Sequence, residues 1–481
     1  MRLFHGGRVD PGAAVPAGSP FPVVVALVLV VLAATRTACL AAAPATTGPS
    51  PVGAVKPVRR LDLRSCIDLA TRQNPDLLGS LQAEQAARWR YYQQRALFNP
   101  TLTASAYRKQ LSEAPLVGNS VRSFSSKVTD ESVTFNQTLY TFGRLEAGKR
   151  ARKLQSRASR IDTETARQAV RFEVVRAYYD VVLAKKLIQV ASDNVAQVQR
   201  QFDQARMLFE GRLAARFDVI RARTQLANAQ PALIRAQQDH EVQRQALLRV
   251  MGVEDDLEFD VADGFDDRAV ALDREGALRM AFEHRPDLLA LMTRYAAARS
   301  SVKEQARQNN PVLNVQSALD RTRGQKNPYD ESVPMNYYQV AVSFPIWDGG
   351  VRNAKVGEAV AELGRLEQQV KKLRDTIRFE VVQALALIRE ALAVIASSSA
   401  VVDQAREAVE IVETAYRQGL RTNLEVLDAQ LARDTALTNQ ARACRDYAVA
   451  RALLERALGH ELPGRPVGLG APIHGAAEKA Q

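Results

Sequence analysis

The pentapeptide RFEVV stands at residues 171–175 and again at residues 378–382, which is 207 positions later. Other residues on both sides of the pentapeptide recur at nearly the same sequence separation, and each recurrence pairs two residues of the same or a similar kind. A fixed internal period indicates a duplicated structural unit, here of roughly 200 residues. The pairs are Gly143 with Gly350, Gly252 with Gly459, Leu139-Tyr140 with Ile346-Trp347 and, at a distance of 211, Asn99-Pro100 with Asn310-Pro311 and PDLL at 75–78 with PDLL at 286–289.

Around the second pentapeptide, apolar residues recur at alternating spacings of three and four. Such a heptad-like stripe is typical of a long helix that packs along one seam. From about Gly350 to Tyr416 this helix would be ~100 Å long at 1.5 Å per residue, which predicts a rod and not a globular domain. The stripe consists of Leu363, Leu366, Val370, Leu373, Ile377, Val381, Leu385, Ile388, Leu392 and Ile395.

Shorter segments between the helices alternate between apolar and polar residues. In YYQVAVSFPIW, residues 337–347, one face would carry Val340, Val342, Phe344 and Ile346, and we expect this face to meet lipid. Each segment is about as long as a tilted strand needs to cross a bilayer. A small soluble sheet would alternate too, but the aromatic ends favour the membrane. The other segments are residues 101–108, 133–142 and 312–319.

Each pair of strands is joined by a segment rich in Gly, Pro, Ser and Asn, residues 109–132 and 321–336, which predicts loops on the cell exterior. Four strands cannot close a barrel, and open sheet edges are not tolerated in lipid. Two copies of the chain would give eight strands with a filled interior, whereas three copies would give twelve and begin to leave a lumen. The expected assembly is therefore a homotrimer.

The N-terminal region contains an apolar run, FPVVVALVLVVLAA at residues 21–34, between a basic start and a stretch of small residues. The run is too short to cross a bilayer as a helix, and the pattern is typical of a secretory signal. We expect residues 1–45 to be a signal and processing region, with a mature chain that starts between Cys39 and Thr46. Lipidation of Cys39 is the alternative. No other run approaches membrane-spanning length, so any crossing is expected to use strands.

The chain has 65 Lys and Arg against 53 Asp and Glu, a net charge of +12. The basic residues are dispersed among carboxylates at helical spacing, which indicates solvated helix faces and not a nucleic-acid surface. The five histidines are scattered, and the sequence lacks HExxH, GxSxG and P-loop signatures, so no catalytic, cofactor-binding or metal site is expected. Cys66 and Cys444 are expected to be free thiols.

The order of the repeated motifs resembles that of the outer membrane efflux protein family, of which TolC is the type. The resemblance implies a mainly α-helical protomer with four transmembrane β-strands and long coiled-coil-like helices in two tandem repeats. Three protomers would form a twelve-strand β-barrel on a twelve-helix periplasmic α-barrel. The matching stretches, between about Leu61 and Gly459, are NPDLL, FNPTLTASAY, FNQTLYTFGRLEAGKRA, FPIWDGGVRNAKV, FEGRLAARFDVIRARTQL and YRQGLRTNLEVLDAQL.

The repeat and the resemblance together predict the boundaries of the parts of the chain. The acidic linker between the repeats belongs either to an equatorial belt around the tunnel or to plain solvated chain. The predicted parts after the signal region are a flexible tail at 46–60, a first repeat at 61–252, the linker at 253–271, a second repeat at 272–459 and a disordered tail at 460–481.

The same resemblance implies a passive exit duct of a tripartite efflux pump or a type I secretion system. The duct would lie in the outer membrane, with its helices in the periplasm. It would need a periplasmic adaptor and an inner-membrane pump of the RND, ABC or MFS type, and it would need no cofactor and no nucleic acid. The alternative is a periplasmic coiled-coil scaffold or adaptor that does not span the outer membrane.

The resemblance also assigns a gate. In the family, two carboxylates of the second helical hairpin ring the narrow periplasmic entrance, and they match Glu425 and Asp428 here; such a ring attracts cations. Links from the second hairpin to the first hold the entrance closed, and the matching residues are Tyr416, Arg421 and Asp218. A Tyr hydroxyl and an Arg fork can both donate to one carboxylate.

The tips of the two hairpins are where the family is thought to meet the adaptor. Arg212 stands where the family has glycine, and Gly419 also suits a plain helix end. The matching tip residues are Gly211, Arg212 and Leu213 in the first copy and Gly419 and Leu420 in the second.

Overall fold

The computed structural model places residues 58–481 in one compact unit and describes most of them. The signal region, the adjoining tail as far as residue 58, and the tip residues Leu213 and Gly419 lie outside the described residues. The described ranges are 59–113, 116–117, 120–121, 124–212, 215–253, 259–262, 264–265, 268–269, 273–324, 333–418, 420–462 and 465–466.

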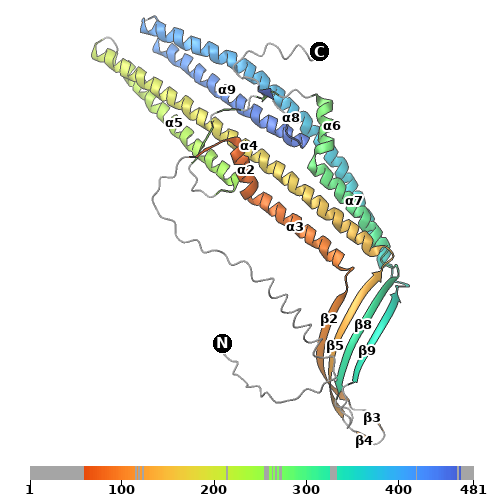
Figure 1. Ribbon diagram of the computed structural model, residues 1–481. Helices are drawn as coiled ribbons and strands as arrows, with labels where there is room; N and C mark the ends of the chain where they lie inside the picture. Colours follow the sequence, from red (N-terminus) through yellow and green to blue (C-terminus); the bar gives the residue numbers. More distant parts are fainter. Residues whose placement is uncertain are drawn as a thin grey trace, which may run out of the picture. The chain divides into compact units, whose positions relative to one another are not determined.

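Two similar runs of helices and strands follow each other along the chain (Figure 1). The long helices have equal lengths in the two runs, 67 residues in α4 and α8 and 36 residues in α5 and α9, so the duplication is visible in the backbone. The elements are β1 (Arg59–Leu61), α2 (Leu63–Gln73), α3 (Pro75–Ala96), β2 (Thr101–Glu113), β3 (Leu116–Val117), β4 (Ser120–Val121), β5 (Phe124–Tyr140), α4 (Arg144–Glu210), α5 (Arg216–Met251), β6 (Phe259–Val261), β7 (Arg268–Ala269), α6 (Arg274–His284), α7 (Pro286–Ala306), β8 (Val312–Gly324), β9 (Val333–Ser343), α8 (Val351–Arg417), α9 (Asn423–Leu458) and β10 (Arg465–Pro466).

The shorter helix of each long hairpin ends at one glycine, and the two glycines occupy corresponding positions of the repeat. Gly252 follows α5 with φ 70° and Gly459 follows α9 with φ 74°, a left-handed backbone that favours glycine. A Cβ on Gly252 would lie 2.5 Å from the Gln73 carbonyl oxygen, and one on Gly459 would lie 2.8 Å from Arg285 Cα. Glycine at both positions therefore lets each hairpin pack directly on the junction between two shorter helices.

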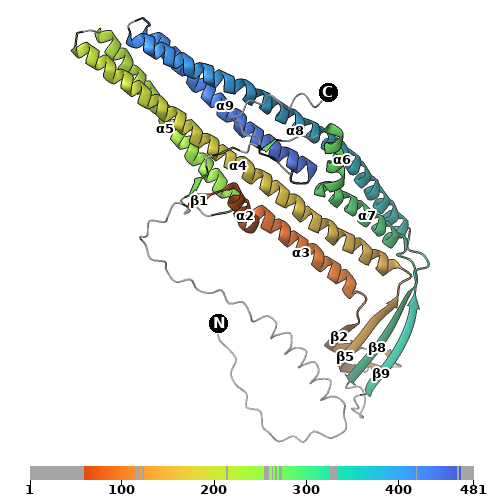
Figure 2. The same cartoon turned by 45° about the horizontal axis from the view of Figure 1, so that its top comes forward.

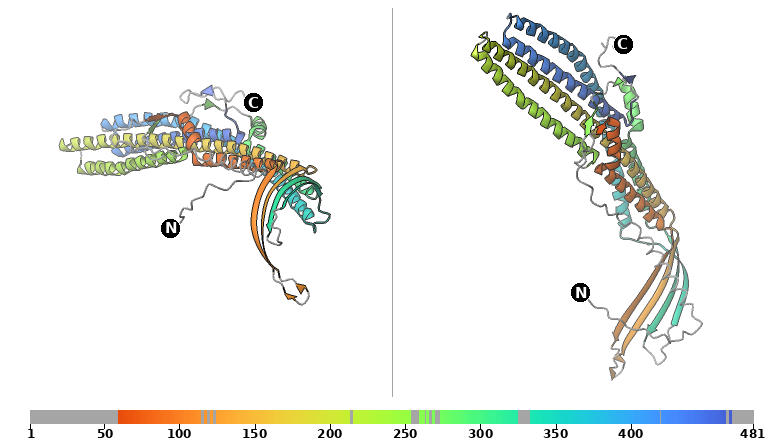
Figure 3. Two further views of the ribbon diagram at one scale, coloured as in Figure 1. Left: turned by 60° about the horizontal axis from the view of Figure 1, so that its bottom comes forward. Right: turned by 60° about the vertical axis from the view of Figure 1, so that its left-hand side comes forward.

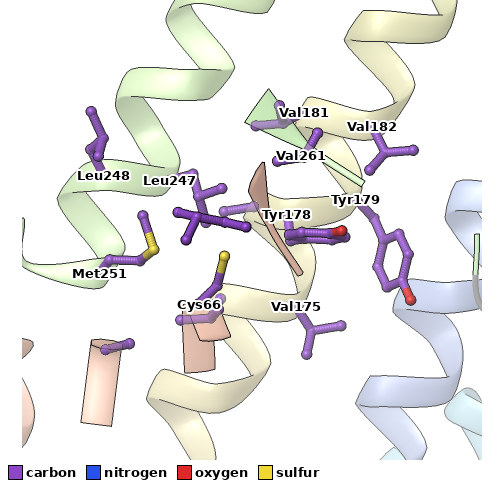
Figure 4. Close-up of a cluster of buried hydrophobic side chains, with 14 of the residues drawn as sticks. Cys66, Val175, Tyr178, Tyr179, Val181, Val182, Leu247, Leu248, Met251 and Val261 are labelled. Carbon is purple, nitrogen blue, oxygen red and sulfur yellow. The ribbon is translucent and has the colours of Figure 1, made fainter. Parts of the chain in front are cut away.

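The two larger apolar cores of the described chain accompany the two repeats. In the first, α4 and α5 pack over α2 and bury Cys66, Leu247 and Met251 completely (Figure 4). Cys66 and Cys444 are free thiols, and burial raises the pKa of Cys66 to about 12. The second core confirms the predicted stripe, because its buried members include Ile377, Val381, Leu385, Ile388 and Ile395.

The two 67-residue helices have different surroundings. α4 contacts α5, α7, α3 and α9, whereas α8 contacts α9, α7 and α6. Figure 2 shows α4 running through the middle of the helices and α8 along one side. One stretch of α8 is long and apolar enough, by length and composition, to cross a membrane, and only 28% of it is buried within the chain. The expectation that no further segment reaches that length was therefore wrong.

The four longest strands form one antiparallel sheet in the order β2-β5-β8-β9. Figure 3 shows this sheet as curved, and Figure 1 shows its strands leaving the ends of α3, α4, α7 and α8. The register between β5 and β8 shifts between Thr138 and Tyr140, which marks a bulge near the helical end.

The strands differ from the predicted segments at both ends of the sheet. β9 ends at Ser343, so Phe344 and Ile346 do not belong to it, because Pro345 lacks the N–H group that would continue the ladder. At the other end, β2 continues to Glu113 and β5 begins at Phe124, so much of the predicted loop at 109–132 is strand. Polar composition marked this part as a loop, although a hairpin ladder continues into water without apolar residues.

Short strands occur in segments predicted to be linker or tail. β1 pairs in parallel with β6, and β7 pairs in antiparallel fashion with β10. β6 and β7 lie within the acidic linker, β10 lies within the expected C-terminal tail, and Arg59 and Arg60 of the expected N-terminal tail belong to β1. Strands this short leave no periodic pattern in a sequence, since alternation needs four or more residues to be recognised.

Candidate functional site

The four-stranded sheet has two chemically different faces. Residues paired across neighbouring strands point to the same face, so the register assigns every row of side chains to one side. One row joins Leu102, Phe135, Ser317 and Tyr338. This face is apolar over four successive rows, whose further members are Tyr140, Leu313 and Val342, then Gln137, Val315 and Val340, and then Ala104, Val133, Leu319 and Asn336.

The other face of the sheet is polar, and its side chains bond to one another. The Ser105 and Ser132 hydroxyls are 2.7 Å apart, and Gln316 Nε2 donates to the Tyr337 hydroxyl at 3.3 Å. Its further members in the central rows include Thr103, Thr134, Asn136, Asn314, Gln339 and Ala341. A sheet with one apolar and one hydrogen-bonded polar face suits a boundary between lipid and water.

The residues predicted to face lipid divide into two groups. Val340 and Val342 lie on the apolar face of β9 and are exposed in the single chain. Phe344 and Ile346 are also exposed but follow the end of the strand.

Aromatic side chains gather where the strands meet the helices. The ring centroids of Tyr140 and Phe142 are 4.7 Å apart in an edge-to-face arrangement, and Trp347, which corresponds to Tyr140 in the repeat, is also exposed. Aromatic residues at the end of an apolar band are typical of the interface between lipid and water.

The first hairpin tip has a strained turn. α4 ends at Glu210 with Gly211 as its C-cap, and Arg212 then takes φ 59°, the left-handed region in which glycine is usual. α5 starts after Ala215, whose N–H donates to the Asp218 carboxylate at 3.3 Å.

The second tip closes without a side-chain cap. α8 ends at Arg417, and the Leu420 N–H donates to the Ala415 carbonyl at 2.9 Å. Leu420 is 73% exposed, and the N-cap of α9, Thr422, makes no capping bond through its side chain. An exposed leucine at the end of a ~100 Å hairpin is a candidate contact for another protein.

The proposed gate residues lie near these tips. Arg421 Nη1 donates to Glu425 Oε2 at 3.4 Å, and the two residues are one helical turn apart. Asp428, the other carboxylate predicted to ring the entrance, is exposed. Burial, and then the charge of Asp218, raise the pKa of the Tyr416 hydroxyl, so these two residues lie close enough to interact. The link from Arg421 to Asp218 stays a prediction.

A polar network just below the tips joins the two hairpins. The Glu413 carboxylate accepts from Gln197 of α4 and, at 3.0 Å, from Gln430 of α9. Gln201 of α4 donates to Gln430 at 3.0 Å, and Gln430 itself is almost fully buried. A turn deeper, Asn194 of α4 donates to Asp434 of α9. These contacts connect the first hairpin to both helices of the second.

This network was not among the predicted sites, although the sequence contains a signal for it. Asn194, Gln197 and Gln201 recur at spacings of three and four, so they share one face of α4.

Asp428, Gln430 and Asp434 line a cavity of about 640 Å³ between α4, α5 and α9. Within the described part of the chain, no cluster of three or more His, Cys, Asp or Glu could hold a metal ion.

An apolar-faced sheet attached to long helical hairpins defines a membrane protein with a large water-exposed helical part. The profile of the family described as outer membrane efflux protein matches residues 66–253 and 277–460. The chain belongs to this family. It is an outer membrane channel of efflux or secretion, with its helical part in the periplasm.

Individual relatives are distant in sequence and similar in fold. The alkaline protease secretion protein AprF of Pseudomonas aeruginosa is 24% identical over 401 residues, which is 80% of this chain and 82% of AprF. TolC of Escherichia coli is 22% identical over 405 residues, 76% of this chain and 81% of TolC. The solved structure of VceC from Vibrio cholerae has a TM-score of 0.71 at 18% identity and covers 83% of this chain and 96% of VceC. The helical channel fold is thus confirmed.

Proposed function

We propose that three copies of the chain close one continuous barrel, in which β2 of each copy pairs with β9 of the next. The observation that carries this proposal is the pair of sheet edges: within the described chain, β2 and β9 each pair on one side only. Backbone groups left unpaired in lipid cost several kcal/mol each, so a membrane sheet must close. Three sheets of four strands would give twelve strands and a lumen.

The exposed apolar stretch of α8 supports the same assembly. Val382, Val394 and Val401 are 37% to 50% exposed in the single chain, on a helix that is mostly unburied along its apolar stretch. Apolar patches of this extent usually mark an interface. In the proposed trimer, helices of a neighbouring copy cover this face, and twelve long helices surround a periplasmic tunnel that continues the barrel.

As a passive duct, the trimer takes its energy from partners. AprF is named for the secretion of a protease, and other relatives are named for efflux, so the cargo is exported material of either kind. We propose an inner-membrane pump of the RND, ABC or MFS type and a periplasmic adaptor. The adaptor contacts the hairpin tips around Gly211, Arg212 and Leu213 and around Gly419 and Leu420.

We further propose that the hairpin tips close the periplasmic entrance. Glu425 and Asp428 of three copies would form a ring of six carboxylates. Tyr416 and Arg421 would donate to Asp218, and the Glu413 network would hold the second hairpin against α4. Opening would require these polar contacts to separate, which is less costly than separating an apolar core because water replaces the lost hydrogen bonds.

The outer membrane location of the family decides against the alternative of a periplasmic scaffold that never enters lipid. The two-faced sheet argues in the same direction. A soluble scaffold would have no use for four rows of apolar side chains that remain exposed on one face.

A matched pair of neighbouring substitutions tests the assembly. Val340→Arg places a charge in the middle rows of the apolar face, where it costs about 2–4 kcal/mol per copy, so heat-resistant trimers in the outer membrane fraction should fall by about tenfold or more. Gln339→Arg, on the polar face, should leave them nearly unchanged. Equal losses would contradict the assignment of the faces, and a wild-type protein without trimers would contradict the assembly.

A further inference from the structure

The apolar face of the sheet changes its character abruptly toward the end away from the helices. Along β8 the apolar rows run from Leu313 to Leu319, which is about 20 Å of strand. The next row on the same face joins Ala106, Glu131 and Arg321. The apolar part of this face therefore ends at the row where charged residues begin.

Arg108 lies one row further on the same face. It pairs with Thr129 across the strands, two positions beyond the pair of Ala106 with Glu131, and its side chain is exposed. Arg321, opposite Glu131, is half-buried. Among the described side chains of these two rows, two guanidinium groups against one carboxylate give this part of the face a positive charge, at the level just beyond the apolar rows.

The opposite face at the same level has the opposite charge. Tyr107 hydrogen-bonds to the Asp130 carboxylate, and Asp320 lies close enough to interact with the same hydroxyl. These side chains alternate with those of Ala106 and Arg108, so they point to the polar side of the sheet. The arginines are thus separated from the lumen by the sheet itself.

We infer that Arg108 and Arg321 form an outward-facing site for the phosphate groups of an anionic glycolipid in the outer leaflet. A guanidinium fork matches phosphate oxygens with two parallel hydrogen bonds, and arginines at the edge of an apolar band reach the headgroup level while their stems contact acyl chains. Glu131 stands directly opposite Arg321 in the register of β5 and β8. Three copies would provide three such sites around the barrel.

This inference rests on the proposed barrel, in which the apolar face meets lipid. The test uses the purified full-length trimer in detergent with two probes: lipid A carrying both phosphates, and the same lipid after removal of both. Native mass spectrometry measures the binding of each lipid, and planar-bilayer recordings of the same sample measure conductance and ion preference. The variant is Arg108→Ala with Arg321→Ala. The control, Arg365→Ala with Arg406→Ala, removes two exposed arginines from α8.

We expect the wild type and the control to bind phosphorylated lipid A about tenfold more tightly than the dephosphorylated lipid, and the variant to lose this preference with unchanged conductance. The variant Arg108→Lys with Arg321→Lys keeps the charge and should retain only part of the preference for phosphorylated lipid A. It replaces the alanine variant in this test if the alanine variant yields no trimer. A wild type that binds both lipids equally, a variant that keeps the preference, or a variant that alters ion preference instead would overturn the site while leaving the channel intact. Absence of wild-type trimers would overturn both proposals.

Discussion

The two copies of RFEVV have the same sequence but differ in how deeply their side chains are buried. In the first, Phe172 packs against the core under the Arg456 guanidinium and Val175 is 8% exposed. In the second, Phe379 is 66% exposed and Val382 is 37% exposed. The difference follows from position, because α4 is surrounded by helices of its own chain and α8 is not. The first copy is covered within its own chain, and the second presents an apolar surface, which in the proposed trimer meets a neighbouring chain.

The repeats also differ where they are joined to their shorter helices. At one position the first copy has Asn74, whose amide donates to the Val250 carbonyl at 2.7 Å. The second copy has Arg285, which bonds Asp287 at 2.6 Å and also contacts Glu380. The two repeats have the same backbone fold. The junction between their two shorter helices is held by a neutral amide in the first copy and by a cluster of charged side chains in the second.

The largest expected difference between the copies lies at this junction. Arg285→Ala leaves two carboxylates without their cation in a site where the arginine is only 10% exposed, and should cost about 3 kcal/mol of unfolding free energy. Asn74→Ala removes a helix cap and one long-range bond and should cost about 1–2 kcal/mol. Helical circular dichroism during thermal unfolding measures both, with exposed Arg365→Ala as the control. A larger loss for Asn74→Ala would contradict the comparison.

The two phenylalanines of the pentapeptide should affect different properties. Phe172→Ala removes apolar contacts from the core and should lower the stability of the helical fold by about 2 kcal/mol. Phe379→Ala should leave the fold of the chain nearly intact and weaken the association of chains. The helical signal on heating reports the first effect, and the temperature at which the trimer band disappears on gels reports the second. If Phe379→Ala left trimers as heat-resistant as the wild type, another surface would form the interface.

Substitutions of charged residues near the two hairpin tips should have different effects on the ion preference of the channel. Glu425→Ala with Asp428→Ala should reduce the cation preference of the channel in planar bilayers, because each exposed charge contributes only about 1 kcal/mol at contact but six would surround one axis. The control is Arg221→Ala, at the position of the first hairpin that corresponds to Asp428. Tyr416→Phe with Arg421→Ser should raise conductance. Unchanged recordings in both double variants would place the gate elsewhere.

The smallest expected effect is at the first tip. Arg212→Gly relieves a left-handed backbone at a non-glycine residue and should stabilise the protein by about 0.5–1 kcal/mol. Gly211→Ala, at an ordinary φ of −76°, should change stability little. Thermal unfolding distinguishes the two, and a destabilising Arg212→Gly would mean that the arginine side chain itself holds the turn.

The sequence predicted what depends on local periodicity and missed what depends on packing between distant segments. The stripe from Leu363 to Ile395 and the paired glycines were visible because helix spacing and left-handed turns are local properties. The Glu413 network was not found, because it depends on which face of α4 meets α8 and α9. The end of β9 could have been found from Pro345, whereas the continuation of β2 to Glu113 depends on a ladder that polar residues do not reveal.

In the proposed assembly the open edges of the sheet join three copies into a ring, and cysteine cross-linking between β2 and β9 tests this ring most directly. The background is Cys66→Ala with Cys444→Ala, and pairs are scanned with one cysteine at Thr103 or Ser105 and one at Gln339 or Ala341. At least one pair should give dimer and trimer bands that reduction abolishes, with nothing larger, and single cysteines should give none. A chain that stays monomeric for every pair, or a ladder that continues beyond three, would contradict this assembly.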